Sequence, residues 1–332
     1  YLYIELEFFQ NLYFCLLKFG VIGEPCIDYI HREGFDSEKH LGGILYSVVS
    51  LAVISKKSDE VYPIMNLGMD EYENVTSFLS KFKNIKLDFI NKCSHNTRVV
   101  NLYYKSWSPA TDSKTYDREE SSTEPAFPVI FKQISPAINI MDGILVNMIS
   151  GVDLTLDTLI VLRNEFKGYM HMDFHNIVMS TAKDGTRMRS PVKNWRQWCS
   201  NCDTLQMNES EISAISEEGL NEYKAAEIIL TEGTVKALVI TRSKQGASLY
   251  QKKIKERAGE KYFELDKIDV PSVETPDFKD STGCGDVFAS AFFYKLTENN
   301  LSDLSASIHF ANRMASRNAT LIGPEELHKL ND

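Results

Sequence analysis

The chain has 332 residues, of which 43% are hydrophobic and 25% are charged. These proportions are typical of a folded globular protein and exclude disordered and collagen-like chains. The formal net charge of -10 argues against a general nucleic-acid binder, which needs a basic face to displace counterions from phosphates. This length suits one large domain, alone or with a small appendage.

The first residues are set apart from the rest of the chain by their aromatic content. Residues 1–18 carry Glu5 and Glu7 early and lack a basic start, which argues against a signal peptide. The QNLYF string within them resembles the remnant of a protease-tag site, so we treat this range as an N-terminal segment outside the domain. The chain has no uncharged apolar stretch of about 18 residues, and we expect no membrane contact.

Strand-like and helix-like patterns alternate from residue 19 onward. Short buried strands are predicted at 19–23, 144–148, 169–174 and 235–241, and helices at 44–54, 154–166, 283–298 and 304–319. This alternation predicts an α/β fold with a mainly parallel central sheet that helices cover on both faces. Sparse, scattered cysteines indicate reduced thiols, and hence a cytoplasmic protein.

Two polar segments interrupt this alternation. Residues 30–41 are polar, and residues 96–134 continue from a strand-like run into a stretch dense in Ser, Thr, Pro and acidic residues. Long irregular insertions are often lids. We therefore predict a small β-rich lid from these two segments, and a large domain from 19–29, 42–95 and 135–332. Pairing of two lids in a homodimer stays open.

The most informative string is DSTGCGD at residues 280–286, which an apolar helical pattern follows. Gly283 and Gly285 permit a tight turn, and the helix N-terminus behind them offers N–H groups to an anion. We expect Asp286 to stay ionised beside these groups and to accept a proton. Such a site suits phosphoryl transfer to a hydroxyl. The simpler alternative is a glycine turn in which Asp286 only begins a helix.

The whole heptapeptide resembles the signature of the PfkB (ribokinase-like) family of carbohydrate kinases. The resemblance extends over most of the chain from about residue 19, and it implies a ribokinase-like fold. It also implies that the amides of Gly283, Cys284 and Gly285 form an anion hole and that Asp286 is the catalytic base.

Further strings resemble the parts of this family that bind substrate. By resemblance, Asp28 binds substrate hydroxyls, and Gly42 and Gly43 match the glycine pair beside the substrate. Ser47 stands where the family usually has the asparagine of a substrate contact. Glu73 replaces the last glycine of a GxDxxG stretch.

Two more strings resemble the nucleotide-binding parts of the family. Asn208 and Glu211 match an NxxE motif that organises Mg²⁺ and the ATP phosphates, with Glu211 acting through water. Thr241 and Gly246 resemble a TxGxxG stretch beneath the nucleotide, in which Ser243 replaces the first glycine. The resemblance leaves a monovalent cation open as a further cofactor. Taken alone, Glu211 would be read as an exposed helix residue.

Other residues of metal-ligating or basic type have simpler interpretations. The pair Cys199 and Cys202 has no second ligand pair nearby, so we expect structural thiols rather than a zinc site. His171, Asp173 and His175 would share one face of a strand, with Asp173 near the active-site end rather than in a metal site.

The basic segment 181–193 contains Lys183, Arg187, Arg189 and Lys193. Its simplest interpretation is a solvated loop. The alternative is that the loop approaches the phosphates of the nucleotide or of the substrate.

Together these patterns predict an ATP-dependent phosphotransferase that acts on a hydroxyl of a small sugar or sugar-like molecule. A nucleoside kinase is the alternative within the family. A ligand-binding or regulatory protein with weak or lost catalysis is the alternative outside it, and the departures at Ser47, Glu73 and Ser243 motivate that alternative. A nicotinamide-dependent dehydrogenase is disfavoured because no GxGxxG follows the first strand.

Overall fold

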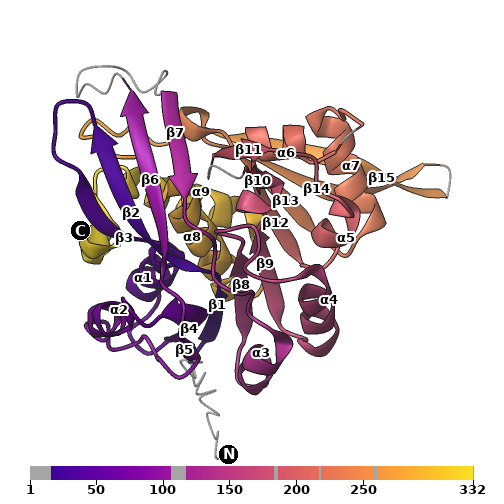
Figure 1. Cartoon of the computed structure of the whole chain (residues 1–332). Coiled ribbons are helices and arrows are strands. Elements are labelled where there is room, and N and C mark those ends of the chain that lie inside the picture. The colour runs from indigo at the N-terminus through magenta and orange to yellow at the C-terminus, as the bar shows by residue number, and fades with distance from the viewer. Residues whose placement is uncertain (1–15, 106–116, 183–185, 217, 258–259, 332) are drawn as a thin grey trace, which may run out of the picture.

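The core of the molecule is a nine-stranded sheet with helices on both faces (Figure 1). A computed structural model describes residues 16–105, 117–182, 186–216, 218–257 and 260–331. The strand order is β15 (Glu260–Val270), β14 (Ala247–Arg257), β13 (Ala237–Thr241), β12 (Thr204–Asn208), β9 (Tyr169–Asp173), β8 (Gly143–Asn147), β1 (Lys18–Ile22), β4 (Glu60–Gly68) and β5 (Ile90–Cys93). The strands from β13 to β5 run parallel, whereas β14 runs antiparallel to both of its neighbours, β13 and β15.

The central strands are apolar on both sides because helices cover both faces of the sheet. In β1, the side chains of Phe19 and Val21 face one apolar core, and Ile22 packs in the other. In β8, Leu145 packs in the same core as Phe19, and Ile144 packs in the same core as Ile22. This continuous burial produces the uninterrupted apolar runs that the sequence shows.

The helices divide between the two cores. One core contains side chains of α1 (Ile44–Ile54), α2 (Tyr72–Leu79), α8 (Cys284–Glu298), α9 (Leu304–Asn318) and the 3₁₀ segment η3 (Pro324–Lys329). The other contains side chains of α3 (Phe131–Ile138), α4 (Leu156–Glu165), α5 (Trp195–Cys199), α6 (Glu209–Ala214) and α7 (Glu222–Glu232). Among the described helices, none combines the length and the apolar character that crossing a membrane requires.

A second sheet of four strands stands beside the large one (Figure 1). Its order is β3 (Glu38–Gly43), β2 (Pro25–Arg32), β6 (Arg98–Lys105) and β7 (Asp117–Ser122). The predicted lid ranges, 30–41 and 96–134, contain most of it. The sheet also includes 25–29 and 42–43, because β2 pairs with β3 along its length. The range 131–138 instead forms α3, whose buried Ile134 packs in a core of the large domain.

A short hairpin connects the two parts of the molecule. It is formed by β10 (Met179–Thr181) and β11 (Arg187–Arg189), which follow the 3₁₀ segment η1 (His175–Val178). Thr186, beside β11, forms an antiparallel bridge with Ser121 of β7. The hairpin, which belongs to the large domain by sequence, therefore lies against the edge of the small sheet.

Candidate active site

A cavity of about 470 Å³ lies at the carboxyl ends of the parallel strands. Asp173 ends β9, Asn208 ends β12 and Thr241 ends β13, and all three line the cavity. Residues of the small sheet and of the DSTGCGD string complete the lining. Open parallel sheets bind ligands at this edge, because the loops there leave a crevice.

The glycine turn at the start of α8 forms one wall of this cavity. Gly283 precedes the helix with a φ of 76°, a left-handed conformation that glycine adopts without strain. A Cβ at this position would lie 2.2 Å from Cδ1 of Tyr46, so the ring leaves no room for another residue. A Cβ on Gly285, by contrast, would meet open space. The turn therefore requires glycine at 283, and Gly285 leaves the backbone accessible.

The predicted anion-hole amides differ in their hydrogen bonding. The N–H of Cys284 donates to the carbonyl oxygen of Ser281 at 3.2 Å, so the turn itself already uses it. The thiol of Cys284 donates to the carbonyl of Ala315, and burial raises its pKa to about 12. Cys284 is thus a neutral packing residue of the turn. Gly283 and Gly285 stay as the predicted backbone donors to an anion.

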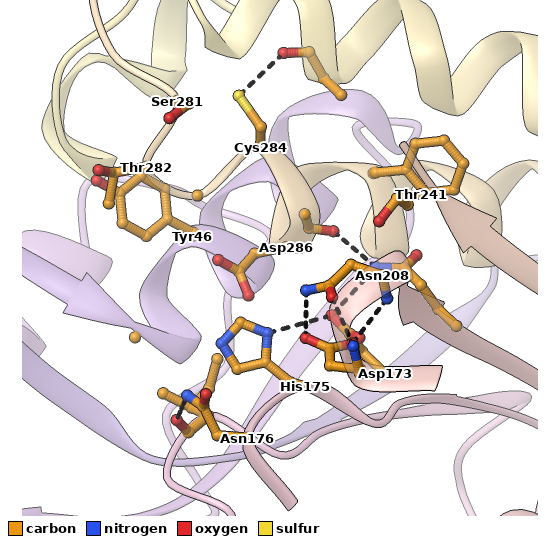
Figure 2. A pocket seen from close by; sticks show the side chains of 18 of the residues that line it. Tyr46, Asp173, His175, Asn176, Asn208, Thr241, Ser281, Thr282, Cys284 and Asp286 are labelled. Atoms are coloured by element: carbon orange, nitrogen blue, oxygen red, sulfur yellow. Dashed lines mark hydrogen bonds and ion pairs between the residues drawn. The ribbon is translucent and has the colours of Figure 1, made fainter. Parts of the chain in front are cut away.

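Asp286 lies in the first turn of α8 and lines the cavity (Figure 2). Its oxygen Oδ1 accepts a hydrogen bond from Nδ2 of Asn147 at 2.7 Å. Burial raises the pKa of Asp286 to about 7, and the nearby Asp28 raises it further, whereas the Asn147 bond lowers it. Asp286 is therefore only partly ionised near neutral pH, less than the sequence led us to expect, because loss of water on burial outweighs the hydrogen bonds that favour the carboxylate. A pKa near the working pH suits a general base.

Asp173, His175 and Asp286 approach one another in the middle of the cavity (Figure 2). One ligand atom from each lies within 4.8 Å of the others, and Nδ1 of His175 is 3.8 Å from Oδ2 of Asp173. Burial raises the pKa of Asp173 well above its ordinary value, with smaller contributions from Glu211 and Asp286. The proximity of these groups places Asp173 at the active-site end of its strand, as predicted.

The predicted alignment of both histidines on one strand face is wrong. Strand β9 ends at Asp173, and His175 begins η1 with a φ of 42°. This turn directs His175 into the cavity, whereas His171 is fully buried and its Nδ1 shares a hydrogen bond with Thr204. Burial lowers the pKa of His171 to about 3, so it is a neutral core residue.

Asn208 and Glu211 form a capping box at the start of α6. The side-chain oxygen of Asn208 accepts from the N–H groups of Ser210 and Glu211, and Oε2 of Glu211 accepts from the N–H of Asn208. Both side chains line the cavity. Burial raises the pKa of Glu211 to about 8, so the interpretation of Glu211 as an exposed helix residue is wrong.

The predicted nucleotide-binding stretch also reaches the cavity. Thr241, Ser243 and Gly246 all belong to its lining. Gly246 has a φ of 92°, and a Cβ there would lie 2.1 Å from the carbonyl oxygen of Val270. Ser243, at the position of the missing glycine, adopts a φ of 50° in the 3₁₀ segment η2 (Ser243–Gln245). The serine therefore keeps a glycine-like backbone conformation.

The predicted substrate residues of the small sheet form another part of the cavity lining. Asp28 lines it from β2, and Gly43 lines it from the end of β3. Gly42 is absent from the lining but lies directly behind Asp28, since a Cβ at Gly42 would be 2.1 Å from Oδ2 of Asp28. The absence of a side chain at Gly42 thus leaves space for the Asp28 carboxylate, whereas Gly43 borders the cavity directly.

Ser47 does not reach this space. It is fully buried in α1 and is absent from the cavity lining. Its Oγ accepts from Nδ2 of Asn147 at 3.1 Å, and the same nitrogen donates to Asp286. The expectation of a direct substrate contact at Ser47 is therefore not met in this geometry, because the helix points the residue at Asn147. Glu73 is exposed on α2, pairs with Lys92 and is also absent from the lining.

Three residues in or directly behind the cavity lining were not predicted from the sequence or were left open by it. Asn147 ends β8 and holds Asp286, but an asparagine after an apolar run gives only a weak signal. Gln206 donates from Nε2 to Asp173 and to the carbonyl of Gly285. Arg187 belongs to the basic segment and lines the cavity, which excludes a purely solvated role for it. Lys183 lies outside the described residues.

The CxxC thiols are structural, as expected. Cys199 and Cys202 are both free, and each is at most 1% exposed. Burial raises the pKa of the Cys199 thiol well above its ordinary value. Neutral, inaccessible thiols of this kind pack like small apolar side chains.

Comparison with known proteins bears on this geometry. The profile of the pfkB family carbohydrate kinases matches residues 173–328. This range contains Asp173, the NxxE string at 208–211, the stretch from Thr241 to Gly246 and the DSTGCGD string with Asp286. The resemblance to the PfkB family is confirmed over this part of the chain. No curated protein matches the sequence.

Solved structures of the ribokinase family share the fold over nearly the whole chain. A pyrophosphate-dependent kinase of that family has a TM-score of 0.73 at 17% identity, covering 94% of this chain and 99% of its own. Ribokinase from Thermotoga maritima has 0.69 at 18% identity, with 94% and 95% covered. A fructokinase with bound ATP from Xylella fastidiosa has 0.69 at 14% identity, with 93% and 94% covered. The ribokinase-like fold is thereby confirmed.

Proposed function

We propose that this protein is an ATP-dependent phosphotransferase that moves the γ-phosphoryl group to a hydroxyl of a sugar or sugar-like molecule. The observation that carries the proposal is the place of Asp286. It lies at the start of α8 beside the glycine turn, in one cavity with Glu211 and Asp28. Donor and acceptor motifs from distant parts of the chain thus converge on one carboxyl group.

In the proposed reaction, Asp286 accepts the proton of the attacking hydroxyl. Its pKa of about 7 lets it take up a proton near neutrality, and Asn147 orients it. The amides of Gly283 and Gly285 stabilise negative charge on the transferring group. Asp28 orients the acceptor by accepting hydrogen bonds from its hydroxyls. The small sheet serves as the lid, which excludes water that would compete as the acceptor.

The donor end has the chemistry that Mg²⁺ and a triphosphate need. Its side chains offer carboxyl and amide oxygens, which are the ligands that Mg²⁺ prefers. Oε1 of Gln206 is buried and has no hydrogen-bond partner among the described residues, and Gln206 also borders the cavity. Glu211, with Asp173 nearby, would hold Mg²⁺ through water. The metal would neutralise phosphate charge beside these carboxyl groups.

A phosphoryl-transfer assay tests this proposal. Purified protein with Mg²⁺ is offered ATP and, in parallel, pyrophosphate, because a pyrophosphate-dependent kinase shares the fold. The acceptors are pentoses, hexoses, cyclitols and nucleosides. We expect ADP release that depends on one acceptor class and is lost by at least about 100-fold in Asp286→Asn. Asp157→Asn, on the exposed face of α4, is the matched control and should keep full activity.

Three results would contradict the proposal in different ways. Turnover with pyrophosphate alone would contradict the donor. Equal turnover of wild type and Asp286→Asn would contradict the base. Ligand binding without any transfer would favour the alternative of a regulatory protein that keeps the fold without catalysis.

A further inference from the structure

A charged wall at the acceptor end of the cavity has no part in the chemistry proposed above. It consists of Arg187 from β11 and Glu120 from β7, which form an ion pair between the hairpin and the small sheet. Both residues line the cavity. The Arg187 side chain is 2% exposed, and its Nε has no hydrogen-bond partner among the described residues. A buried guanidinium N–H without a partner is costly until a ligand oxygen accepts from it.

The hairpin and the small sheet, which are paired with each other, hold the two residues of this ion pair in place. The Arg187 backbone follows Thr186, which bridges to Ser121, the neighbour of Glu120. The ion pair therefore lies directly beside the contact that joins hairpin and lid. The small sheet contributes both Glu120 and Asp28 to the cavity, and the charge of Glu120 acts on Arg98 in the same sheet, so we assign the pair to the acceptor side of the space.

The charges of the lining decide which acceptors this wall favours. Two arginines stand against six carboxyl side chains: Asp28, Glu120, Asp173, Glu209, Glu211 and Asp286. Arg98 is already paired with the buried Glu24 at 3.4 Å, and Arg187 is paired with Glu120. Neither arginine offers uncompensated positive charge. The raised pKa values of Asp173, Glu211 and Asp286 leave those carboxyls partly protonated, but an acceptor that carries a carboxylate or phosphate still finds no free positive charge here and meets the carboxyl group of Glu120.

The apolar part of the lining argues against a nucleobase. The aromatic residues that border the cavity are Tyr46 and Phe288, and each is only 3% exposed. Buried rings of this kind offer no open face on which a base could stack. The aliphatic side chains Val100, Leu102 and Ile149 also border the cavity and are 4–5% exposed, so the little apolar surface of the lining is more aliphatic than aromatic and suits the C–H face of a saturated ring better than a base.

We propose that the Arg187–Glu120 pair is a specificity filter that selects a neutral polyol against sugar acids, sugar phosphates and nucleosides. A hydroxyl both donates and accepts, so adjacent hydroxyls of a polyol accept from Nε of Arg187 and donate to Glu120. A carboxylate or phosphate cannot donate to Glu120 and is repelled by it. This inference rests on the proposed function for the reaction, and it names the acceptor class.

The test measures binding and turnover separately. Calorimetry and the transfer assay use matched pairs that differ in charge: D-glucose with D-glucuronate, D-fructose with fructose 6-phosphate, and D-ribose with ribose 5-phosphate, plus myo-inositol and adenosine. In the wild type, we expect the preferred neutral polyol to bind at least about 10-fold more tightly than its anionic partner. Arg187→Met should raise KM for this polyol about 10- to 100-fold, with a smaller change in kcat, because a charged hydrogen bond is lost.

Glu120→Gln gives a readout that a merely structural role would not. It keeps the size of the side chain but releases the charge of Arg187, so the anionic partner should gain about 10-fold relative to the neutral sugar. Arg196→Met, at an exposed guanidinium on α5, is the matched control and should change neither affinity nor preference. If Arg187→Met does not fold, Arg187→Lys should keep the discrimination against anions and lose affinity for the polyol.

The outcomes separate this filter from the proposed function. Polyol binding that depends on Arg187, without transfer from any donor, would refute the proposed function and support the filter. Turnover that prefers a sugar acid, a sugar phosphate or adenosine would support a kinase and overturn the filter. Absence of binding by every neutral polyol, or an unchanged preference in folded Glu120→Gln, would also overturn it.

Discussion

The hydrogen bond from Asn147 to Asp286 controls the proton affinity of the proposed base. Asn147→Leu removes this bond while keeping a side chain of similar size in the buried site. The bond favours the ionised carboxylate, so its loss raises the pKa of Asp286 above its value of about 7. A hydrogen bond to a charged group is worth about 1.5–3 kcal/mol, which corresponds to roughly one to two pKa units.

This shift has a calculable effect on activity. At pH 7, about half of the Asp286 carboxyl groups are ionised in the wild type, against roughly 1–10% in Asn147→Leu. We therefore expect kcat/KM to fall about 5- to 50-fold at pH 7 and to recover toward the wild-type value above pH 9. The assay is a profile of kcat/KM from pH 5.5 to 9.5 with a saturating donor.

The controls separate a shifted pKa from damage to the fold. Ser47→Ala removes only the second acceptor of Asn147. The acid limb of the kcat/KM profile of this variant should therefore shift much less than that of Asn147→Leu. Asn164→Ala, at an exposed position of α4, should leave the profile unchanged. An acid limb that stays in place in Asn147→Leu while the rate drops equally at every pH would refute the reasoning.

Three further changes test the stability of the site. Asp286→Asn should stabilise the fold at pH 8 but not below pH 4. Folding raises the pKa of Asp286 to about 7, so ionisation of the buried carboxyl opposes folding by up to about 4 kcal/mol above pH 7. Thermal melting of both proteins at the two pH values measures this difference. Gly283→Ala should cost about 2 kcal/mol or more in urea unfolding, because of its positive φ and the close ring, whereas Gly285→Ala should unfold like the wild type; equal losses would count against the turn geometry. Arg98→Met should cost about 3–5 kcal/mol by leaving Glu24 unpaired in the interior, and adding Glu24→Gln should restore part of the loss; no recovery in the double variant would contradict this pairing.

Local patterns in the sequence predicted the large domain well where side chains are buried on both sides. The strand at 144–148 and the helix at 44–54 are mostly apolar, because each is enclosed by a core, and their polar members, such as Asn147 and Ser47, are buried as well. The charged hairpin of β14 and β15 was not predicted. It lies at the edge of the sheet, where Ile254 is 74% exposed and polar residues replace the buried pattern.

The sequence alone also predicted the two local motifs on which the proposed chemistry rests. The DSTGCGD string specifies a helix start with glycines and an acid at a fixed spacing, and NxxE specifies a helix cap. Both are local motifs whose geometry follows from neighbouring residues. A single chain segment therefore contains enough information to predict them.

Only the tertiary structure decided how these motifs act on one another. The pKa of Asp286 depends on burial and on Asn147, which is 139 positions away along the chain. Ser47 was predicted to contact the ligand, but the packing of α1 directs it to Asn147 instead. Arg187 forms its ion pair with Glu120 because the hairpin pairs with the lid. Burial and long-range contacts are properties of the folded chain, so no local pattern could give them. The opening composition predicted one large domain with a small appendage, and the fold shows that this appendage supplies one wall of the cavity.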